Sequence, residues 1–197
     1  MSAVPCVLGF DPSKTKLGWG AVRDADGSPV RCGYQPHGGS PEAVHDAIAD
    51  IAVGLAYDGY EPTFALIEYP FGGGSTGGNS IFESGVAVGM VELSARLRWG
   101  IPLDRIGASH WRPRVGVPSP PAELRGKSNA TARRDWLKAA DVDLARELGF
   151  DLPIVGARKR RPSDDAADGA LIARAAWLAL ESEAPGSPQR TTERSAA

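Results

Sequence analysis

The chain has 197 residues, of which 42% are hydrophobic and 23% charged, proportions typical of one folded domain rather than of a disordered or fibrous protein. It contains no run of about 18 apolar residues and no basic leader followed by an apolar segment, so we expect a cytoplasmic protein that does not span a membrane. The two cysteines, Cys6 and Cys32, are too few for a disulfide framework or a zinc site, and we expect both to be reduced and buried.

The net charge of −2 conceals two parts of opposite sign. Residues 105–161 contain 13 Lys and Arg against 6 Asp and Glu, whereas the rest of the chain contains 9 against 18. A basic segment in an otherwise acidic protein predicts a surface that faces a polyanion, although a solvated basic helix without a partner would give the same counts.

The N-terminal part predicts three strands in an antiparallel meander, over residues 4–11, 17–23 and 29–34. A helix follows, with Ser40 as its N-cap and Pro41 as its first residue. Apolar residues recur along this helix at intervals of three and four, which is the pattern of a helix with one buried face.

The middle of the chain predicts a buried strand over residues 63–68, a helix over 80–98 and a short strand over 103–106. A glycine-rich loop over 70–79 joins the first two of these elements. Several prolines then predict irregular chain over 108–128.

Two further helices are predicted, over 129–148 and 163–180, and residues 183–197 have the composition of a disordered tail. Residues 1–182 would then be a single domain. The order of elements predicts an α/β fold with a five-stranded mixed sheet, its first three strands an antiparallel meander, and with helices on both faces.

Four carboxylates stand where such a sheet binds ligands. Asp11 ends the first strand and Glu68 the fourth, and Asp165 and Asp168 lie three residues apart at the start of the last helix. Two like charges about 4 Å apart repel by roughly 4 kcal/mol at an effective dielectric constant of 20, so a cluster of acids needs a cation. Oxygen ligands favour Mg²⁺ or Mn²⁺, and two such ions can activate a water and stabilise the leaving oxygen in phosphodiester cleavage. The alternative is that the helical aspartates are ordinary N-terminal caps, since spacing alone does not bring the three segments together.

In this order the segments resemble the RuvC-type Holliday junction resolvases of the RNase H-like, or retroviral integrase, superfamily, in a divergent or phage-type form. The resemblance rests on residues 8–13 (Leu-Gly-Phe-Asp-Pro-Ser) with 18–22 (Gly-Trp-Gly-Ala-Val), 65–71 (Ala-Leu-Ile-Glu-Tyr-Pro-Phe) and 165–171 (Asp-Ala-Ala-Asp-Gly-Ala-Leu). Ser13 replaces the usual glycine and Gly169 a usual alanine, and residues 108–162 match poorly.

The resemblance implies an RNase H-like fold and a metal-dependent endodeoxyribonuclease that resolves four-way DNA junctions by paired symmetric nicks. It implies that Asp11, Glu68, Asp165 and Asp168 are both the catalytic acids and the ligands of two Mg²⁺ ions, with Mn²⁺ able to substitute. It also implies a homodimer, for which the helix over 80–98 offers small residues, although this helix can equally pack on its own sheet.

Basic residues and one aromatic residue are candidates for contact with branched DNA. Phe71 follows Glu68 by three residues, where the family has an aromatic that intrudes at the junction centre, and the alternative is a core or loop-anchoring role. The candidates for phosphate contact are Arg112, Arg114, Lys127, Arg133, Arg134, Lys138, Arg158, Lys159 and Arg160.

Three other interpretations stay open to different degrees. A nuclease of the same fold that acts on flaps, forks, RNA–DNA hybrids or other branched DNA would carry the same carboxylates. A non-catalytic DNA-binding relative is disfavoured, because unused acids would repel DNA. A sugar kinase or actin-like ATPase is disfavoured by the chain length, so we expect no nucleotide cofactor.

Overall fold

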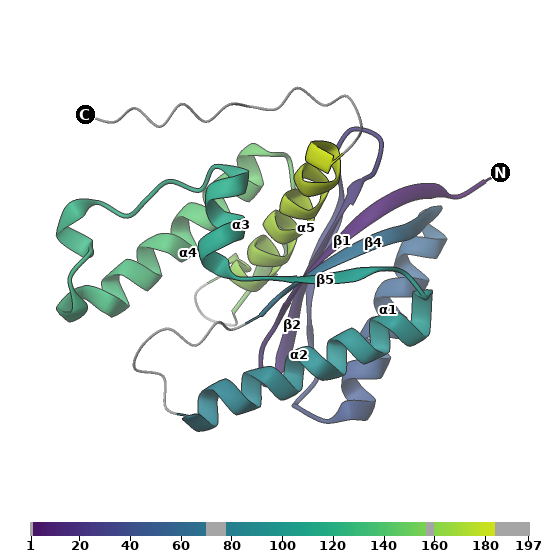
Figure 1. Ribbon diagram of the computed structural model, residues 1–197, viewed down its shortest axis with the longest axis horizontal. Coiled ribbons are helices and arrows are strands. Elements are labelled where there is room, and N and C mark those ends of the chain that lie inside the picture. Colours follow the sequence, from purple (N-terminus) through teal and green to yellow (C-terminus); the bar gives the residue numbers. More distant parts are fainter. Residues whose placement is uncertain (1, 70–77, 157–159, 184–197) are drawn as a thin grey trace.

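The structure, a computed structural model, describes residues 2–69, 78–156 and 160–183 and contains a five-stranded sheet of order β3-β2-β1-β4-β5 (Figure 1). Strands β1, β2 and β3 form an antiparallel meander, and β4 and β5 add to β1 in parallel. The strands are β1 (Val4–Pro12), β2 (Lys16–Arg23), β3 (Pro29–Pro36), β4 (Tyr60–Glu68) and β5 (Leu103–Ile106). This confirms the predicted mixed sheet.

Helices cover both faces of the sheet, as predicted (Figure 1). Helices α1 (Pro41–Tyr57) and α2 (Gly78–Trp99) lie on one face, and α3 (Ala108–Val115), α4 (Ala130–Glu147) and α5 (Asp164–Glu183) on the other. Successive side chains of a strand point to opposite faces. Leu8 and Phe10 of β1 therefore join the core under α1 and α2, and Val7 joins the core under α5.

Helix α5 lies unusually close to the sheet because glycines face each other at the contact. A Cβ atom added at Gly9 of β1 would lie 2.1 Å from the backbone nitrogen of Ala173, and one added at Gly169 of α5 would lie 2.4 Å from that of Trp19. Real Cβ atoms do not approach backbone so closely, so the helix can sit here only while these positions lack side chains. The close contact fixes the start of α5 relative to the ends of β1 and β2.

The predicted cap of α1 is confirmed, because the Ser40 hydroxyl accepts a hydrogen bond from the Ala43 N–H at 3.1 Å. The prediction of irregular chain after Ala108 is wrong over α3, an eight-residue helix that contains Pro113. Proline removes one helical hydrogen bond, but the fully buried Trp111 fastens α3 to the core and outweighs that loss.

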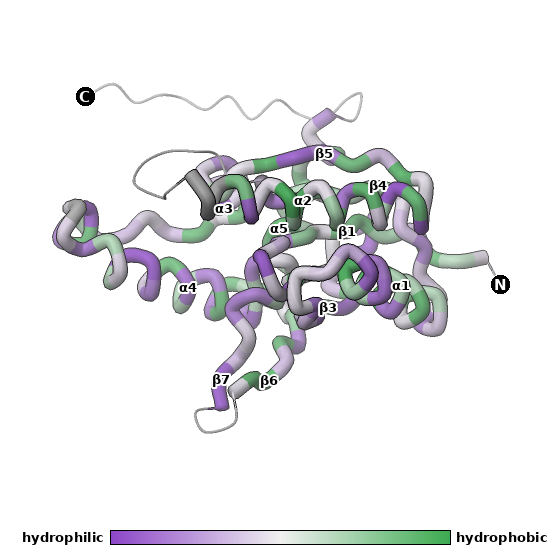
Figure 2. The backbone as a smooth tube through the Cα atoms, turned by 90° about the horizontal axis from the view of Figure 1, so that it is seen from below, coloured by the Kyte–Doolittle hydropathy of each residue, from purple (hydrophilic) through white to green (hydrophobic). Residues whose placement is uncertain are grey.

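Short elements complete the described chain. They are two 3₁₀ turns, η1 (Ala122–Leu124) and η2 (Lys127–Asn129), and the two-stranded hairpin β6 (Ile154–Val155) and β7 (Arg161–Pro162). Figure 2 shows this hairpin standing off from the body of the molecule. No helix in the described residues is long and apolar enough to cross a membrane.

Two predictions depend on residues at the limits of the described chain. The predicted tail begins at Glu183, which still belongs to α5, and residues 184–197 lie outside the described residues. Most of the glycine-rich loop, 70–77, also lies outside them. Both cysteines are free, as expected, but Cys32 is half-buried whereas Cys6 is buried.

Candidate active site

Asp11 and Glu68 lie side by side at the carboxyl ends of two parallel strands. Phe10 of β1 pairs with Ile67 of β4, so the next residue on each strand, Asp11 and Glu68, are neighbours. Side chains alternate along a strand, and Val7 of β1 and Leu66 of β4 both face α5. Asp11 and Glu68 therefore point to the same face of the sheet, toward α5.

Helix α5 brings Asp168 to the same place. Asp168 is only 7% exposed, and its pKa lies well above the usual range because of burial and the charges of Asp11 and Asp141. Burial, together with the charges of Glu68 and Asp165, raises the pKa of Asp11 to about 8. Burial also raises the pKa of Glu68. These acids are thus close enough to repel one another, although they come from three separate segments of the chain.

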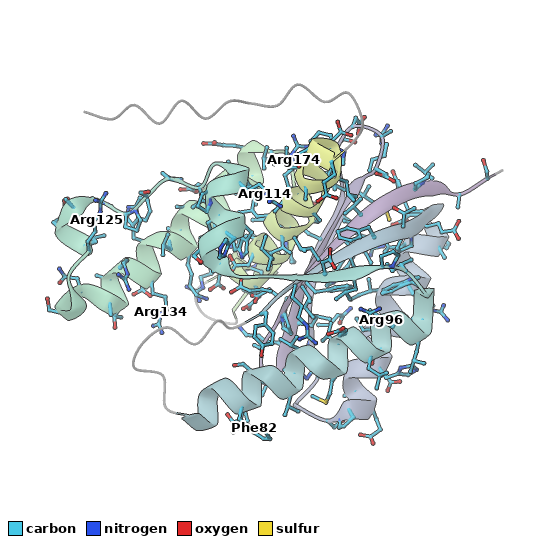
Figure 3. The ribbon with its side chains drawn as sticks, viewed as in Figure 1. Phe82, Arg96, Arg114, Arg125, Arg134 and Arg174 are labelled. Atoms are coloured by element: carbon cyan, nitrogen blue, oxygen red, sulfur yellow. The ribbon has the colours of Figure 1, made fainter. Side chains whose placement is uncertain are left out.

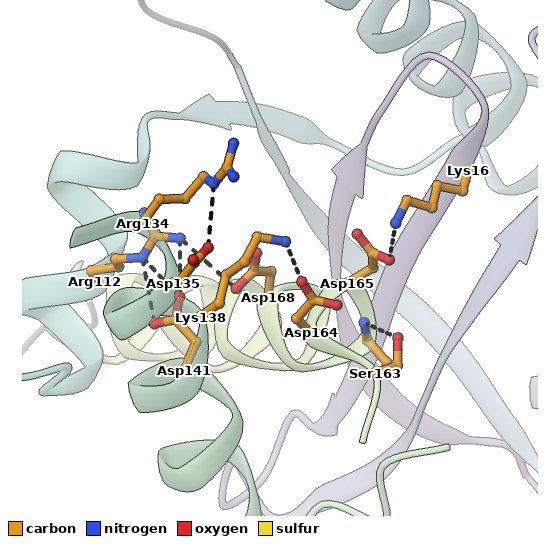
Figure 4. Close-up of polar contacts among 11 residues, drawn as sticks. Lys16, Arg112, Arg134, Asp135, Lys138, Asp141, Ser163, Asp164, Asp165 and Asp168 are labelled. Carbon is orange, nitrogen blue, oxygen red and sulfur yellow. Dashed lines mark hydrogen bonds and ion pairs between the residues drawn. The ribbon is translucent and has the colours of Figure 1, made fainter. Parts of the chain in front are cut away.

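The other acids at the start of α5 are paired with lysines (Figure 4). Lys16 of β2 forms a short ion pair with Asp165, and Lys138 of α4 forms one with Asp164. Asp165 is therefore close enough to act on Asp11 electrostatically, yet its carboxylate already has a cationic partner.

Arg112 of α3 places a cation at the edge of the acidic cluster (Figure 4). Its Nε and Nη2 atoms each lie 3.0 Å from Oδ2 of Asp141, a fully buried residue of α4. Its Nη2 atom lies 3.8 Å from Oδ1 of Asp168, too far for a hydrogen bond. Next to it in the chain, the Trp111 indole donates a 2.6 Å hydrogen bond to Oε2 of Glu68.

Sequence reasoning missed four residues that pair at the site. Lys16 and Trp111 are partners of Asp165 and Glu68, and Asp141 and Asp164 are partners of Arg112 and Lys138. The three ion pairs join residues 26 to 149 positions apart, and no local pattern marks such pairs. Trp111 lies in the segment that was predicted to be irregular because of its prolines.

The carboxylate oxygens of the site are suitable ligands for a divalent metal ion. Oδ1 of Asp168 is buried and has no hydrogen-bond partner among the described residues, as expected of an oxygen meant for another ligand. All candidate donors are carboxylate oxygens, which suit Mg²⁺ or Mn²⁺. Within the described part of the chain, however, no three His, Cys, Asp or Glu side chains are arranged to hold an ion as they stand.

The predicted DNA-contacting residues fall into three groups. Arg112, 21% exposed, and Lys138 are paired with acids of the cluster. Arg114, Arg133, Arg134 and Arg160 are exposed. Phe71, Arg158 and Lys159 lie outside the described residues, as does the side chain of Lys127.

An extension that runs from η1 into the first half of α4 carries a set of exposed arginines. Figure 3 shows Arg125 and Arg134 on this extension, well away from the sheet. We call this extension the basic arm and define it by its exposed Arg125, Arg133 and Arg134. Arg125 was not among the predicted residues.

Comparison with solved structures shows which known proteins share this fold. RuvC of Thermus thermophilus, in complex with a Holliday junction substrate, is 17% identical and superposes with a TM-score of 0.56 over 89% of this chain and 94% of that chain. A second structure of Thermus thermophilus RuvC is 17% identical, with a TM-score of 0.53 over 89% and 95% of the two chains. The sequence matches no family model and no curated protein. The chain therefore has a RuvC-like, RNase H-like fold.

Proposed function

We propose that this chain is a Mg²⁺-dependent endonuclease that resolves four-way DNA junctions by paired symmetric nicks and acts as a homodimer. The convergence of Asp11, Glu68 and Asp168 at one end of the sheet carries the proposal. The fold adds support, because a RuvC structure of the same fold holds a Holliday junction substrate.

Asp11, Glu68, Asp165 and Asp168 would hold two ions. Bound there, the ions would supply an activated water and charge stabilisation at the leaving oxygen. The chain itself provides positive charge beside these acids, since Arg112 and Lys138 lie close enough to Asp11 to lower its pKa. This charge lowers the electrostatic barrier to an approaching phosphodiester, which acids alone would repel. Arg112 and Lys138, although paired with Asp141 and Asp164, would in this way reduce the repulsion between the site and the DNA backbone.

The outer face of α2 supports the dimer. Ala87, Val88, Val91 and Ala95 pack this helix against the sheet. On its opposite side the helix presents Phe82, Val86, Leu93 and Leu97, which are between 44% and 72% exposed. Figure 3 shows Phe82 pointing away from the body of the molecule.

These four side chains recur at helical spacing and form one apolar stripe, which we call the α2 stripe. Helices at the surface of a monomer keep this side polar. The exposed Gly89 also lies on the outer side, where nothing lies within 4 Å of an added Cβ, so another helix can approach closely. A second copy of the chain could bury this face with its own α2 stripe in a symmetric interface.

The basic arm supports the choice of DNA as substrate. Phosphate contacts position a protein on DNA without reading its sequence, and exposed arginines on a projecting helix are well placed for them. The arm would contact a duplex arm of the junction while the acids reach the strand to be cut.

The test is a nicking assay on a synthetic immobile four-way junction, with linear duplex of the same sequence as the control substrate. We expect nicks on opposite strands of the junction that require Mg²⁺. Asp11→Asn should abolish nicking and keep DNA binding, whereas Asp143→Asn, at an exposed aspartate of α4, should cut normally.

Other results would contradict the proposal in distinct ways. Faster cutting of flaps, forks or RNA–DNA hybrids than of the junction would assign the chain to another nuclease of this fold. Binding of the junction without cutting under any divalent ion would favour a non-catalytic relative. Full cleavage by Asp11→Asn would refute the assignment of the site.

A further inference from the structure

The hydrogen bond from Trp111 to Glu68 joins the core of the protein to one of the candidate catalytic acids. Trp111 is fully buried and belongs to the core between the sheet and α5. Its indole N–H donates to Oε2 of Glu68 at 2.6 Å. A tryptophan that serves only to fill space needs no carboxylate as its acceptor, since a backbone carbonyl or a water would satisfy the same N–H.

The ring of Trp111 is also in contact with the guanidinium of Arg112. The guanidinium carbon of Arg112 lies 4.5 Å from the ring centroid, and the guanidinium is itself bonded to the buried Asp141 of α4. Buried ion pairs add little net stability, because both charges must leave water. The Arg112–Asp141 pair does fix the orientation of the guanidinium, and the guanidinium closes over the indole.

Glu68 is a flexible side chain in a place where position matters. It has three rotatable bonds and lies at the end of β4, where the strand no longer restrains its tip. With Oε2 bonded to Trp111, Oε1 is the oxygen left for another ligand. A carboxylate held by one oxygen presents the other in a defined direction.

We propose that Trp111 is a positioning residue for Glu68, whose indole N–H fixes Oε2 so that Oε1 is directed at a divalent ion shared with Asp11 and Asp168. The inference rests on the proposed function, because it assumes that these acids bind metal. Trp111 itself touches neither substrate nor ion. Its role resembles that of the hydrogen-bond partners that orient metal ligands in other proteins.

The chain contains a matched control for this tryptophan. Trp177 of α5 also donates its indole N–H to an oxygen, the backbone carbonyl of Asp24, at 2.9 Å. Its ring also carries a guanidinium, that of Arg174, 4.2 Å from the centroid. Trp111→Phe and Trp177→Phe therefore remove the same hydrogen-bond donor, the first from a fully buried tryptophan and the second from a half-buried one, but only the first donor contacts a candidate catalytic acid.

The test measures Mn²⁺ binding without DNA, by the electron paramagnetic resonance signal of free Mn²⁺. We expect Trp111→Phe to weaken Mn²⁺ binding by about 10-fold, the effect typical of losing a partner that orients a metal ligand. Trp177→Phe should bind Mn²⁺ like the wild type. In the nicking assay, Trp111→Phe should need a correspondingly higher Mg²⁺ concentration for half-maximal rate, with a near-normal rate at saturation and unchanged junction affinity in EDTA.

A loss of Mn²⁺ affinity equal in the two variants would overturn the inference, as would unchanged affinity in Trp111→Phe. If Trp111→Phe does not fold, the ¹H–¹⁵N resonance of the Trp111 indole in the wild type tests the inference instead. That resonance is assigned through the other single Trp→Phe variants. Addition of Mg²⁺ should shift the Trp111 resonance and leave that of Trp177 in place, and an unshifted Trp111 resonance would refute the proposal.

The same measurements separate this inference from the proposed function. A wild-type protein that binds Mn²⁺ but leaves every branched DNA uncut would contradict the nuclease proposal, and the Mn²⁺ affinities of the two variants would still decide the role of Trp111. A wild-type protein that binds no Mn²⁺ would overturn the inference itself.

Discussion

Asp11 holds a proton in the folded chain at pH values where the unfolded chain has lost it, because its pKa is raised to about 8 from an ordinary value near 3.8. Between these two values the folded state binds more protons than the unfolded state. The free energy of unfolding therefore falls as the pH rises through this window, provided that no divalent ion is present. Burial and the neighbouring charges of Glu68 and Asp165 are the cause.

Replacing Asp11 with asparagine should stabilise the metal-free protein at high pH. The amide cannot ionise, so the Asp11→Asn variant should be as stable as the wild type near pH 4 and more stable than the wild type at pH 8. We expect a melting temperature at pH 8 higher by about 2–4 °C, the change that roughly 1 kcal/mol produces in a chain of this size. Thermal unfolding in EDTA at both pH values measures it. Asp143→Asn serves as the control, and an equal gain in that variant or no pH dependence of the gain would contradict the explanation.

Single residues also show how far the sequence could predict the site. Asp11, Glu68 and Asp168 could be found because each lies at the end of a strand or the start of a helix, where local patterns are strong. Lys16 and Asp141 could not, because their roles depend on partners that only the folded backbone brings near. Arg112 was predicted to contact DNA, and its salt bridge to the buried Asp141 is invisible in the sequence.

At the scale of elements, the contact between α5 and the sheet determines where the acids of α5 lie. Gly169→Ala should be destabilising, since its Cβ would meet the backbone of Trp19 at 2.4 Å and the helix would have to move. Overpacking of this kind costs about 1–3 kcal/mol. Displacement of α5 would also move Asp165 and Asp168, so nicking should fall with stability. Chemical denaturation measures the first effect and the junction assay the second.

Gly85→Ala is the matched control for this prediction. Gly85 also lies inside a helix, but nothing lies within 4 Å of an added Cβ. Alanine is favoured over glycine in a helix by about 1 kcal/mol, so this variant should be as stable as the wild type or more so. A Gly169→Ala protein that is equally stable would show that α5 does not depend on the close contact.

The α2 stripe gives a second prediction at this scale. Leu93→Glu combined with Leu97→Glu places two charges on the exposed side of α2, where the monomer has little packing to lose. We expect the wild type to sediment as a dimer at micromolar concentration and this variant as a monomer with an unchanged melting transition. A wild-type monomer in sedimentation would contradict the homodimer, and a dimeric double variant would place the interface elsewhere.

Elements were predicted well where a local pattern and tertiary packing agree. The five strands and the cap of α1 follow from alternation and from Ser40. Helix α3 could not be predicted, because its proline opposes a helix and the burial of Trp111, a tertiary effect, decides the outcome. The exposed apolar side of α2 is also present in the sequence, but periodicity alone does not say which of two apolar sides meets the sheet.

At the scale of the whole molecule, charge is distributed unevenly. The basic arm extends from one end of the molecule, whereas Arg96 lies on the opposite side, near the C-terminal end of α2 (Figure 3). Each neutralised phosphate contributes about −0.9 to the slope of log K against log salt for duplex DNA. We therefore expect Arg133→Ala with Arg134→Ala to weaken junction binding and to reduce this slope by about 2.

Arg96→Ala with Arg98→Ala removes the same net charge from the other side of the molecule and is the control. It should change neither the affinity nor the slope beyond a small general effect. Fluorescence anisotropy over a series of salt concentrations measures both variants. Equal slopes for the two variants would show that net charge, rather than the basic arm, governs binding.

Asp11 is translated well before Asp165 and Asp168, yet helix α5 brings these acids near one another in the folded chain. A chain interrupted before Asp164 lacks two of the four acids, together with the helix that packs against β1 and β2. An activity that needs all four acids arises only after the ribosome has passed the last helix. Under the proposed function, unfinished copies of the protein would therefore not cut DNA.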